Sequence, residues 1–225
     1  MKKKFLIILC ICISTISLAQ INEIGFFAGG TNYVGDIGNT SYLRPNNMGY
    51  GIIYKWNWNP RIALRGTISS LKISADDADT DNSFRKARGY KFTNTINEVA
   101  LGLEFNFFEY DLSSNDKFAT PYILVELAAF NYNRVSSQTI TGQFFYTDRT
   151  SFAIPFGVGF KSKFAGKLAI AIEAKVRYTF IDDLDYTTAN FSSLNFGGNG
   201  KDWYMLTGIS IVYTFGRPSC YVNSQ

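Results

Sequence analysis

The sequence predicts an all-β protein: an eight-stranded antiparallel transmembrane β-barrel with short periplasmic turns and long extracellular loops. Three observations predict this fold, namely a secretory signal at the N-terminus, eight segments of alternating apolar and polar residues, and connections that are short and long in turn. The 225 residues include 16% aromatic and 18% charged residues, so the chain is too apolar and too aromatic to be disordered. Its length suits one domain with a substantial core.

The N-terminal segment 1–19 has the three parts of a secretory signal peptide. Residues 2–4 are lysines, residues 5–13 form an apolar run, and residues 17–19 place small side chains before a cleavage site. An N-terminal membrane anchor is the alternative. The apolar run is short for a helix that crosses a bilayer, which takes about 20 residues, so we expect the segment to direct export.

The rest of the chain divides into an outer-membrane barrel at 20–215 and a periplasmic C-terminal tail at 216–225. Some of the 22 basic residues belong to the signal, so the exported chain nearly balances its 18 acidic residues and has no charge excess to attract nucleic acid. The absence of histidine removes histidine-dependent catalytic triads and most zinc and haem sites. We expect no enzyme activity, no cofactor and no nucleic-acid partner.

Alternation is clearest in segment 96–108, where Val99 and Leu101 point to one face and Glu98 to the other. A period of two predicts a strand, and this one exceeds the usual length of about 5–6 residues in soluble proteins. Segment 168–179 repeats the pattern. Six further segments show it less clearly: 23–30, 49–56, 62–70, 121–130, 152–161 and 203–215.

The connections between these strands alternate in length. Three are short turns, at 57–61, 109–120 and 162–167. Four are long and rich in Asp, Asn, Ser, Thr and Gly, at 31–48, 72–95, 131–151 and 181–202. Short turns at one rim and long polar loops at the other, with an even number of strands, are typical of outer-membrane barrels.

The apolar face of the strands carries aromatic residues near the strand ends, as the interfacial girdles of membrane barrels do. These aromatic residues are Tyr54, Trp56, Phe105, Phe107, Tyr178, Tyr213 and Phe215. A membrane barrel turns this apolar face outward to the lipid, whereas a soluble, lipocalin-like barrel, the alternative, turns it inward. We predict the membrane polarity, with outer-membrane lipid around the barrel.

The opposite face carries charges of both signs, which then point into the lumen. The predicted lumen residues are Glu23, Lys55, Arg65, Glu98, Glu104, Glu126, Glu173, Lys175 and Arg177. The interior of an eight-stranded barrel is just wide enough for side chains to fill it, and buried charges are costly unless paired. We expect a self-neutralising polar plug that closes the barrel. A proton or ion path is the alternative.

Two acidic runs lie in the long loops. The run 76–82 offers oxygen ligands at short spacing but lacks the glycine and the terminal glutamate of an EF-hand, so we expect a solvated loop, with weak calcium binding as the alternative. Asp182, Asp183 and Asp185 form a similar run, and we interpret it in the same way.

The tail holds Cys220, the only cysteine after the signal. An unpaired cysteine in an oxidising compartment indicates an intermolecular disulfide or a functional thiol, with an incidental surface cysteine as the alternative. We hypothesise that Cys220 ties the barrel to a periplasmic partner.

Four stretches resemble the PorG family of the type IX secretion system: 22–38, 59–67, 103–108 and 177–180. The pattern Asn-Tyr-x-Gly-Asp-Ile-Gly within 22–38, in register with Asn-Pro-Arg-Ile at 59–62, is the most specific part. Members of that family are small outer-membrane barrels of Bacteroidota. They associate with a periplasmic ring made of a lipoprotein and its partner.

The resemblance implies an accessory role in anchoring or assembling this ring, and Cys220 would suit a bond to the ring lipoprotein. A stand-alone surface protein that binds a ligand or a cell through its long loops is the alternative function. A channel for small solutes is a third possibility.

Overall fold

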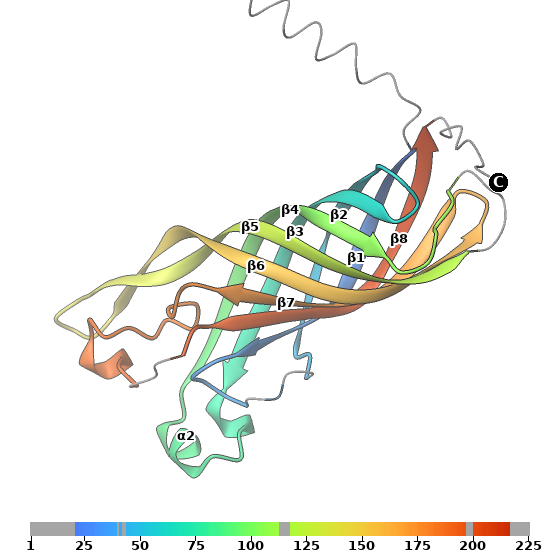
Figure 1. Ribbon diagram of the computed structural model, residues 1–225. Coiled ribbons are helices and arrows are strands. Elements are labelled where there is room, and N and C mark those ends of the chain that lie inside the picture. Colours follow the sequence, from blue (N-terminus) through green and yellow to red (C-terminus); the bar gives the residue numbers. More distant parts are fainter. Residues whose placement is uncertain (1–20, 40, 42–43, 113–117, 197–199, 217–225) are drawn as a thin grey trace, which may run out of the picture.

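The chain forms a closed barrel of eight strands, in which each strand pairs antiparallel with its neighbours in sequence and β1 pairs with β8 (Figure 1). The computed structural model describes residues 21–39, 41, 44–112, 118–196 and 200–216. The strands are β1 (Ile21–Val34), β2 (Asn47–Asn57), β3 (Ile62–Asp76), β4 (Lys91–Asn106), β5 (Ala119–Gln138), β6 (Phe144–Ala165), β7 (Leu168–Thr179) and β8 (Trp203–Gly216). The predicted fold class is confirmed.

Within the described part of the chain, three short helices lie between strands: η1 (Asp77–Asp79), α2 (Ser83–Arg88) and η2 (Ser192–Leu194). Asn82 caps α2, since its side chain accepts hydrogen bonds from the backbone N–H groups of Phe84 and Arg85. Gly89 ends the helix in the left-handed conformation that favours glycine. No helix among the described residues is long and apolar enough to cross a membrane.

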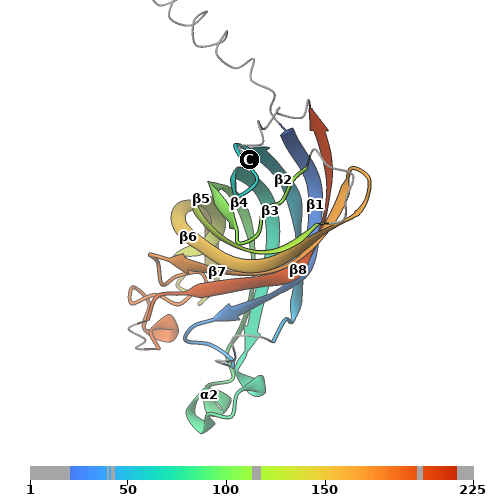
Figure 2. The same cartoon turned by 45° about the vertical axis from the view of Figure 1, so that its right-hand side comes forward.

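The barrel has two different ends. The turn end holds the beginning of β1, the end of β8 and the three short connections, and the loop end holds the four long ones (Figures 1 and 2). At the turn end, β6 and β7 are joined by Gly166 and Lys167 alone, and Gly166 has φ +51°. A tight hairpin needs such positive φ values.

Strand boundaries differ from the predicted ones at the loop end. The predicted loop 131–151 is instead a β-hairpin, because β5 and β6 stay paired from Asn131↔Thr150 out to Gln138↔Phe144. The predicted loop 72–95 likewise contains the paired ends of β3 and β4, from Lys72↔Thr95 to Asp76↔Lys91. We call these extensions the β5–β6 arm (residues 131–150) and the β3–β4 arm (residues 72–95), and they diverge in Figure 1.

The outer face of the barrel is apolar and exposed. Large exposed side chains on it include Ile24, Phe26, Ile52, Ile68, Val99, Leu101, Val125, Leu127, Val158, Ile172, Ile209 and Ile211. The predicted girdle residues also lie on this face, and Tyr54, Phe105, Tyr213 and Phe215 are exposed near the turn end. An apolar exterior around a charged interior is the polarity of a barrel that spans a bilayer, and it excludes the soluble alternative.

The interior has two layers. The charged layer fills the barrel from the turn end to its middle, where the buried ionisable side chains lie beside small apolar clusters such as Tyr122, Leu124 and Ala171. The apolar layer lies toward the loop end and is built from inward-facing residues such as Ile53, Leu71, Ile96, Phe130 and Leu206. The polar plug predicted from the sequence therefore accounts only for the part of the lumen between the turn end and the middle of the barrel.

Candidate functional site

The structure places all nine predicted lumen residues inside the barrel, each at most 9% exposed. Alternation puts them there, because every second residue of a strand faces the lumen. Their long side chains reach across the narrow interior, so their partners lie on strands that are distant in sequence.

Arg65 is the centre of the charged layer. Its Nη1 lies 2.5 Å from Glu173 Oε2 and 3.2 Å from Glu104 Oε2, and its Nε lies 3.8 Å from Glu126 Oε1. The side chain is 1% exposed. One guanidinium thus connects carboxylates from β4, β5 and β7, and its fork of donors is suited to several acceptors at once.

Lysines complete this network. Lys55 Nζ lies 2.8 Å from Glu104 Oε2, and Lys161 Nζ donates to Glu104 Oε1 at 2.6 Å. Lys175 Nζ lies 2.7 Å from Glu126 Oε2. Each of these two buried carboxylates therefore has at least one cationic partner, as a charge inside a protein requires.

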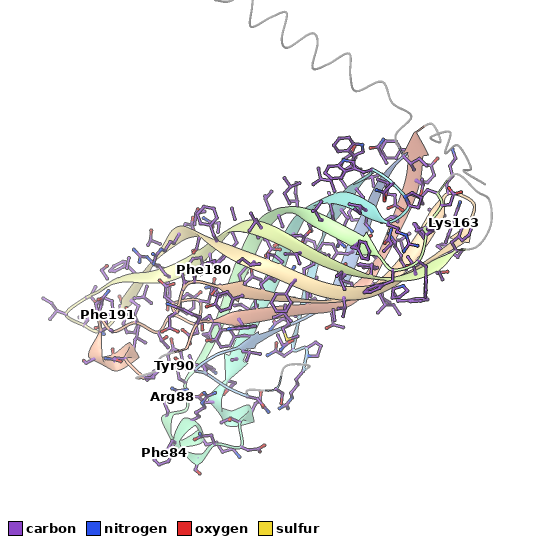
Figure 3. The ribbon with its side chains drawn as sticks, in the orientation of Figure 1. Phe84, Arg88, Tyr90, Lys163, Phe180 and Phe191 are labelled. Carbon is purple, nitrogen blue, oxygen red and sulfur yellow. The ribbon has the colours of Figure 1, made fainter. Side chains whose placement is uncertain are left out.

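Lys161 and Lys163 are lumen residues that the sequence analysis missed. Both are buried, at 1% and 4% exposure. Residues 162–167 had been predicted as a turn, whereas β6 continues to Ala165, and Figure 3 shows Lys163 at the turn end. Lys161 is the last residue of the predicted strand 152–161 and already has the inward register, and continuing the alternation past it would have found Lys163.

A second ion pair lies closer to the apolar layer. Arg177 Nη2 is 3.2 Å from Glu98 Oε1, and the Tyr204 hydroxyl donates to Glu98 Oε2 at 2.7 Å. None of these three side chains is more than 1% exposed. Tyr204 also packs against Phe130, with ring centroids 5.9 Å apart, and so joins the charged layer to the apolar one.

Glu23 is the exception among the predicted lumen residues. It stands opposite Lys55 in the β1–β2 register, yet Lys55 turns to Glu104. Neither carboxylate oxygen of Glu23 has a hydrogen-bond partner within the part of the chain that the structure describes. A buried carboxylate of this kind normally retains ordered water.

The loop end is closed by a cap of loop residues. Leu184 and Ile37 are fully buried and join the apolar layer from the loops after β7 and β1. The Tyr33 hydroxyl donates to Asp185 Oδ2 at 2.9 Å and also to Asp202. Burial, together with the neighbouring carboxylate of Asp185, raises the pKa of Asp202 well above its usual value.

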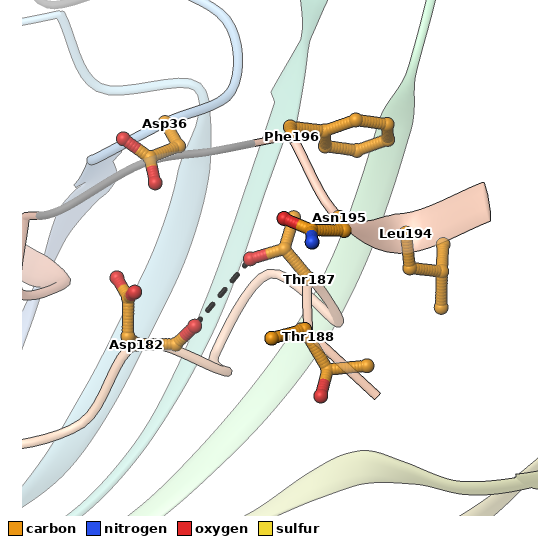
Figure 4. Close-up of a pocket in the computed structure, with 8 residues that line it drawn as sticks. Asp36, Asp182, Thr187, Thr188, Leu194, Asn195 and Phe196 are labelled. Carbon is orange, nitrogen blue, oxygen red and sulfur yellow. Dashed lines mark hydrogen bonds between the residues drawn. The ribbon is translucent and has the colours of Figure 1, made fainter. Parts of the chain in front are cut away.

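Asp182 and Asp36 line a small cavity of about 80 Å³ beside this cap, where the Thr187 hydroxyl donates to the Asp182 carbonyl oxygen at 3.4 Å (Figure 4). Burial and the nearby Asp36 raise the pKa of Asp182 to about 6. The cavity is far below the roughly 300–1,000 Å³ of ligand pockets, so it is no candidate binding site.

The prediction that residues 76–82 form a solvated loop is wrong for Asp77, which is fully buried. Asp77 accepts hydrogen bonds from Arg88 Nε at 2.6 Å and from the backbone N–H groups of Gly38 and Tyr90. Burial alone would raise its pKa, but the bonds from Arg88 and the two N–H groups outweigh it and lower the pKa. Asp77 therefore joins the loop after β1 to α2, and Figure 3 shows Arg88 and Tyr90 close together there.

Other loop carboxylates also have protein partners. Asp183 lies 3.0 Å from Arg149 and accepts a hydrogen bond from Tyr132 at 2.5 Å, and Asp185 accepts two from Thr187. Among the described residues no group of three or more Asp, Glu or Cys is arranged to hold a metal ion. Cys220, the predicted partner contact, and the predicted signal peptide lie outside the described residues.

The chain belongs to the DUF6089 family, described as a domain of unknown function, whose model matches residues 2–224. No curated protein matches the chain. The solved structures to which it is similar, at low identity, include three outer-membrane or surface-protein barrels.

The first of these is Ail, the attachment invasion locus protein of Yersinia pestis, at 13% identity and a TM-score of 0.49, covering 88% of this chain and 100% of that one. The N-terminal β-barrel domain of Pseudomonas aeruginosa OprF has 12% identity and a TM-score of 0.48, covering 88% and 98%. Neisserial surface protein A has 10% identity and a TM-score of 0.49, covering 86% and 97%.

Proposed function

We propose that this protein is a closed barrel of the outer membrane that works by holding a partner, and that the partner is the periplasmic ring of a type IX secretion system. The filled lumen is the observation that supports a non-conducting, non-catalytic role. The Arg65 network blocks the lumen at the middle of the barrel, and the apolar layer, which includes Leu184, closes it toward the loop end. A barrel without a path through it acts at its ends.

The turn end is the end that we assign to the periplasm. The first and last described strand residues, Ile21 and Gly216, are paired there, next to the short connections. Short turns and both termini on the periplasmic side are the usual arrangement of outer-membrane barrels. The tail with Cys220 would then start beside the ring, and the resemblance of segments 22–38 and 59–67 to the PorG family supports the choice of partner.

Non-reducing electrophoresis of outer membranes tests this proposal. We expect the native protein to form a reducible adduct with a periplasmic lipoprotein, identified by mass spectrometry. Cys220→Ser abolishes the adduct, whereas Ser219→Ala, a matched change beside it, retains it. If Cys220→Ser leaves the band unchanged, Cys220 is not the link to the lipoprotein. If no lipoprotein copurifies with the native protein by any route, the anchoring proposal is wrong.

The two arms favour a second candidate function, namely binding at the cell surface. They project from the loop end as paired strands, so they present a fixed surface. Removing the tail after Gly216 separates the two candidates, because an anchor loses its function and a surface binder keeps it. Shortening the β5–β6 arm has the opposite effects.

A further inference from the structure

A cleft opens where the two arms separate. Strands β4 and β5 are paired only from Asn106↔Tyr122 to Asn97↔Asn131, and beyond this point their edges diverge. Asn94 closes the base of the cleft: its side chain donates to the carbonyl oxygens of Asn133 at 2.8 Å and Leu184 at 2.9 Å, and accepts from the Asn133 N–H at 3.3 Å. We call this space the fork cleft.

The fork cleft has a volume of about 560 Å³ and a wall rich in aromatic residues. The cleft is lined by Tyr90, Phe144, Tyr146 and Tyr186, which come from the residue just before β4, from β6 and from the loop after β7. Lys91 and Thr93 add hydrogen-bonding groups to the same wall. The volume falls in the roughly 300–1,000 Å³ range of small-molecule sites, and both apolar and polar groups converge there.

The rings are held in place. Tyr186 packs edge-on against Tyr146, with centroids 4.9 Å apart and planes at 64°, and against Phe92 at 6.2 Å and 82°. The Tyr186 hydroxyl donates to the Thr93 carbonyl oxygen at 3.0 Å. Edge-to-face packing orients the rings and leaves ring surface of Tyr146, which is 55% exposed, open to the cleft.

Tyr186 also has an unusual backbone. Its φ is +67°, and it is the single non-glycine residue with positive φ among those described. Such strain persists only where neighbours impose it, and it concentrates at functional sites. Here the neighbours are Asp185, which accepts two hydrogen bonds from Thr187, and Tyr33, whose hydroxyl donates to Asp185. The buried cap thus fixes the ring that forms one wall of the cleft.

We propose that the fork cleft binds a sugar ring of an oligosaccharide. A pyranose has an apolar C–H face and a rim of hydroxyl groups, which match an aromatic wall bordered by the Lys91 ammonium and the Thr93 hydroxyl. An extended peptide that adds a strand needs a free sheet edge. That edge is obstructed, since Tyr186 occupies the Thr93 carbonyl and Asn94 occupies the N–H and carbonyl of Asn133.

The sugar has two sources at this end of the barrel, the lipopolysaccharide of the same membrane or a lipid-free glycan. Binding in the fork cleft is independent of any ring at the turn end, so either proposal can fail alone. The full-length barrel in lipid nanodiscs is therefore tested with two probes, lipopolysaccharide purified from the producing strain and a microarray of soluble oligosaccharides.

We expect the native barrel to bind at least one of these probes. Tyr146→Ala and Tyr186→Gly lower the affinity at least tenfold, and glycine suits the positive φ at position 186, so the second variant keeps the fold. Phe145→Ala is the matched control, since Phe145 is 55% exposed on the same strand and does not line the cleft. Binding of lipopolysaccharide alone or of soluble glycans alone supports the proposal and identifies the source. Binding of neither, or an equal loss in Phe145→Ala, overturns it.

Discussion

Replacing Arg65 by methionine removes the cation at the centre of the charged layer. Glu173 loses its 2.5 Å partner and keeps Tyr122 and a Lys175 Nζ at 3.5 Å, whereas Glu104 still has Lys55 and Lys161. Breaking a buried ion pair costs about 3–5 kcal/mol, because the remaining charge stays buried without compensation. Since two of the three carboxylates keep close lysines, we expect the low end, about 3 kcal/mol, or roughly a hundredfold in the folding equilibrium.

Urea-induced unfolding of the barrel in lipid vesicles measures this difference, with heat-dependent gel mobility as an independent readout of the folded state. Arg61→Met is the matched control, because Arg61 pairs with Glu109 at 3.4 Å at the surface, where the two side chains are 47% and 71% exposed. An exposed pair contributes about 0–1 kcal/mol. The double variant Arg65→Met with Glu173→Gln removes the carboxylate that depends most on Arg65 and regains part of the loss.

A loss in Arg65→Met no larger than that in Arg61→Met would refute the reasoning. It would mean that the carboxylates around Arg65 are already neutral or hydrated, and the lumen would then be a wet passage and not a plug. A double variant less stable than Arg65→Met alone would also contradict it, because Glu173 would then stabilise the barrel without its cation.

Three further predictions concern the apolar layer and the loop end. Phe130→Ala, at a site that is 1% exposed, destabilises the barrel by about 3–5 kcal/mol, yet planar-bilayer recordings still show no conductance because the charged layer remains. The pKa of Asp77 is below its usual 3.8, so its stabilising effect is present above about pH 4 and is lost as the pH falls through the lowered pKa. We expect amide hydrogen exchange in α2 to become faster over that fall in pH. In Asp77→Asn the exchange is fast at every pH. The pKa of Asp182 is raised to about 6, so the loop 181–196 is most stable below the usual pKa of 3.8 and loses stability as the pH rises to about 6. We expect the amide hydrogen exchange of this loop, corrected for the intrinsic rate, to increase over that pH range. Asp182→Asn removes this pH dependence.

The barrel was predictable because lipid imposes a period of two on every strand that it surrounds. Strand segments that extend beyond the lipid do not need this alternation. Residues 132–138 read Tyr-Asn-Arg-Val-Ser-Ser-Gln and look like a loop, since a strand with water on both faces needs no apolar face. The structure nevertheless pairs them with β6, and the fork cleft between the arms follows from this pairing.

The lumen residues were predictable one by one, and their partners were not. Register places Glu23 opposite Lys55, but a lysine side chain is long enough to reach Glu104 on another strand. Likewise, the acidic neighbours of Asp77 suggest hydration, and only the fold brings Arg88 against it. Sequence spacing fixes the side of a strand on which a charge lies, whereas the choice between acceptors depends on distances across the barrel.

A filled interior also constrains how the two ends of the molecule relate. Gly216, the last residue that the structure describes, and the fork cleft at Tyr186 lie at opposite ends of the barrel, with the Arg65 network and the apolar layer packed between them. Effects of changes at distant sites that share no partner add. The double variant Cys220→Ser with Tyr186→Gly should therefore lose each interaction to the same extent as the single variants. Any departure from additivity would require a second arrangement of the packed lumen, and the Arg65→Met variant, which loosens that packing, is where such coupling would change most.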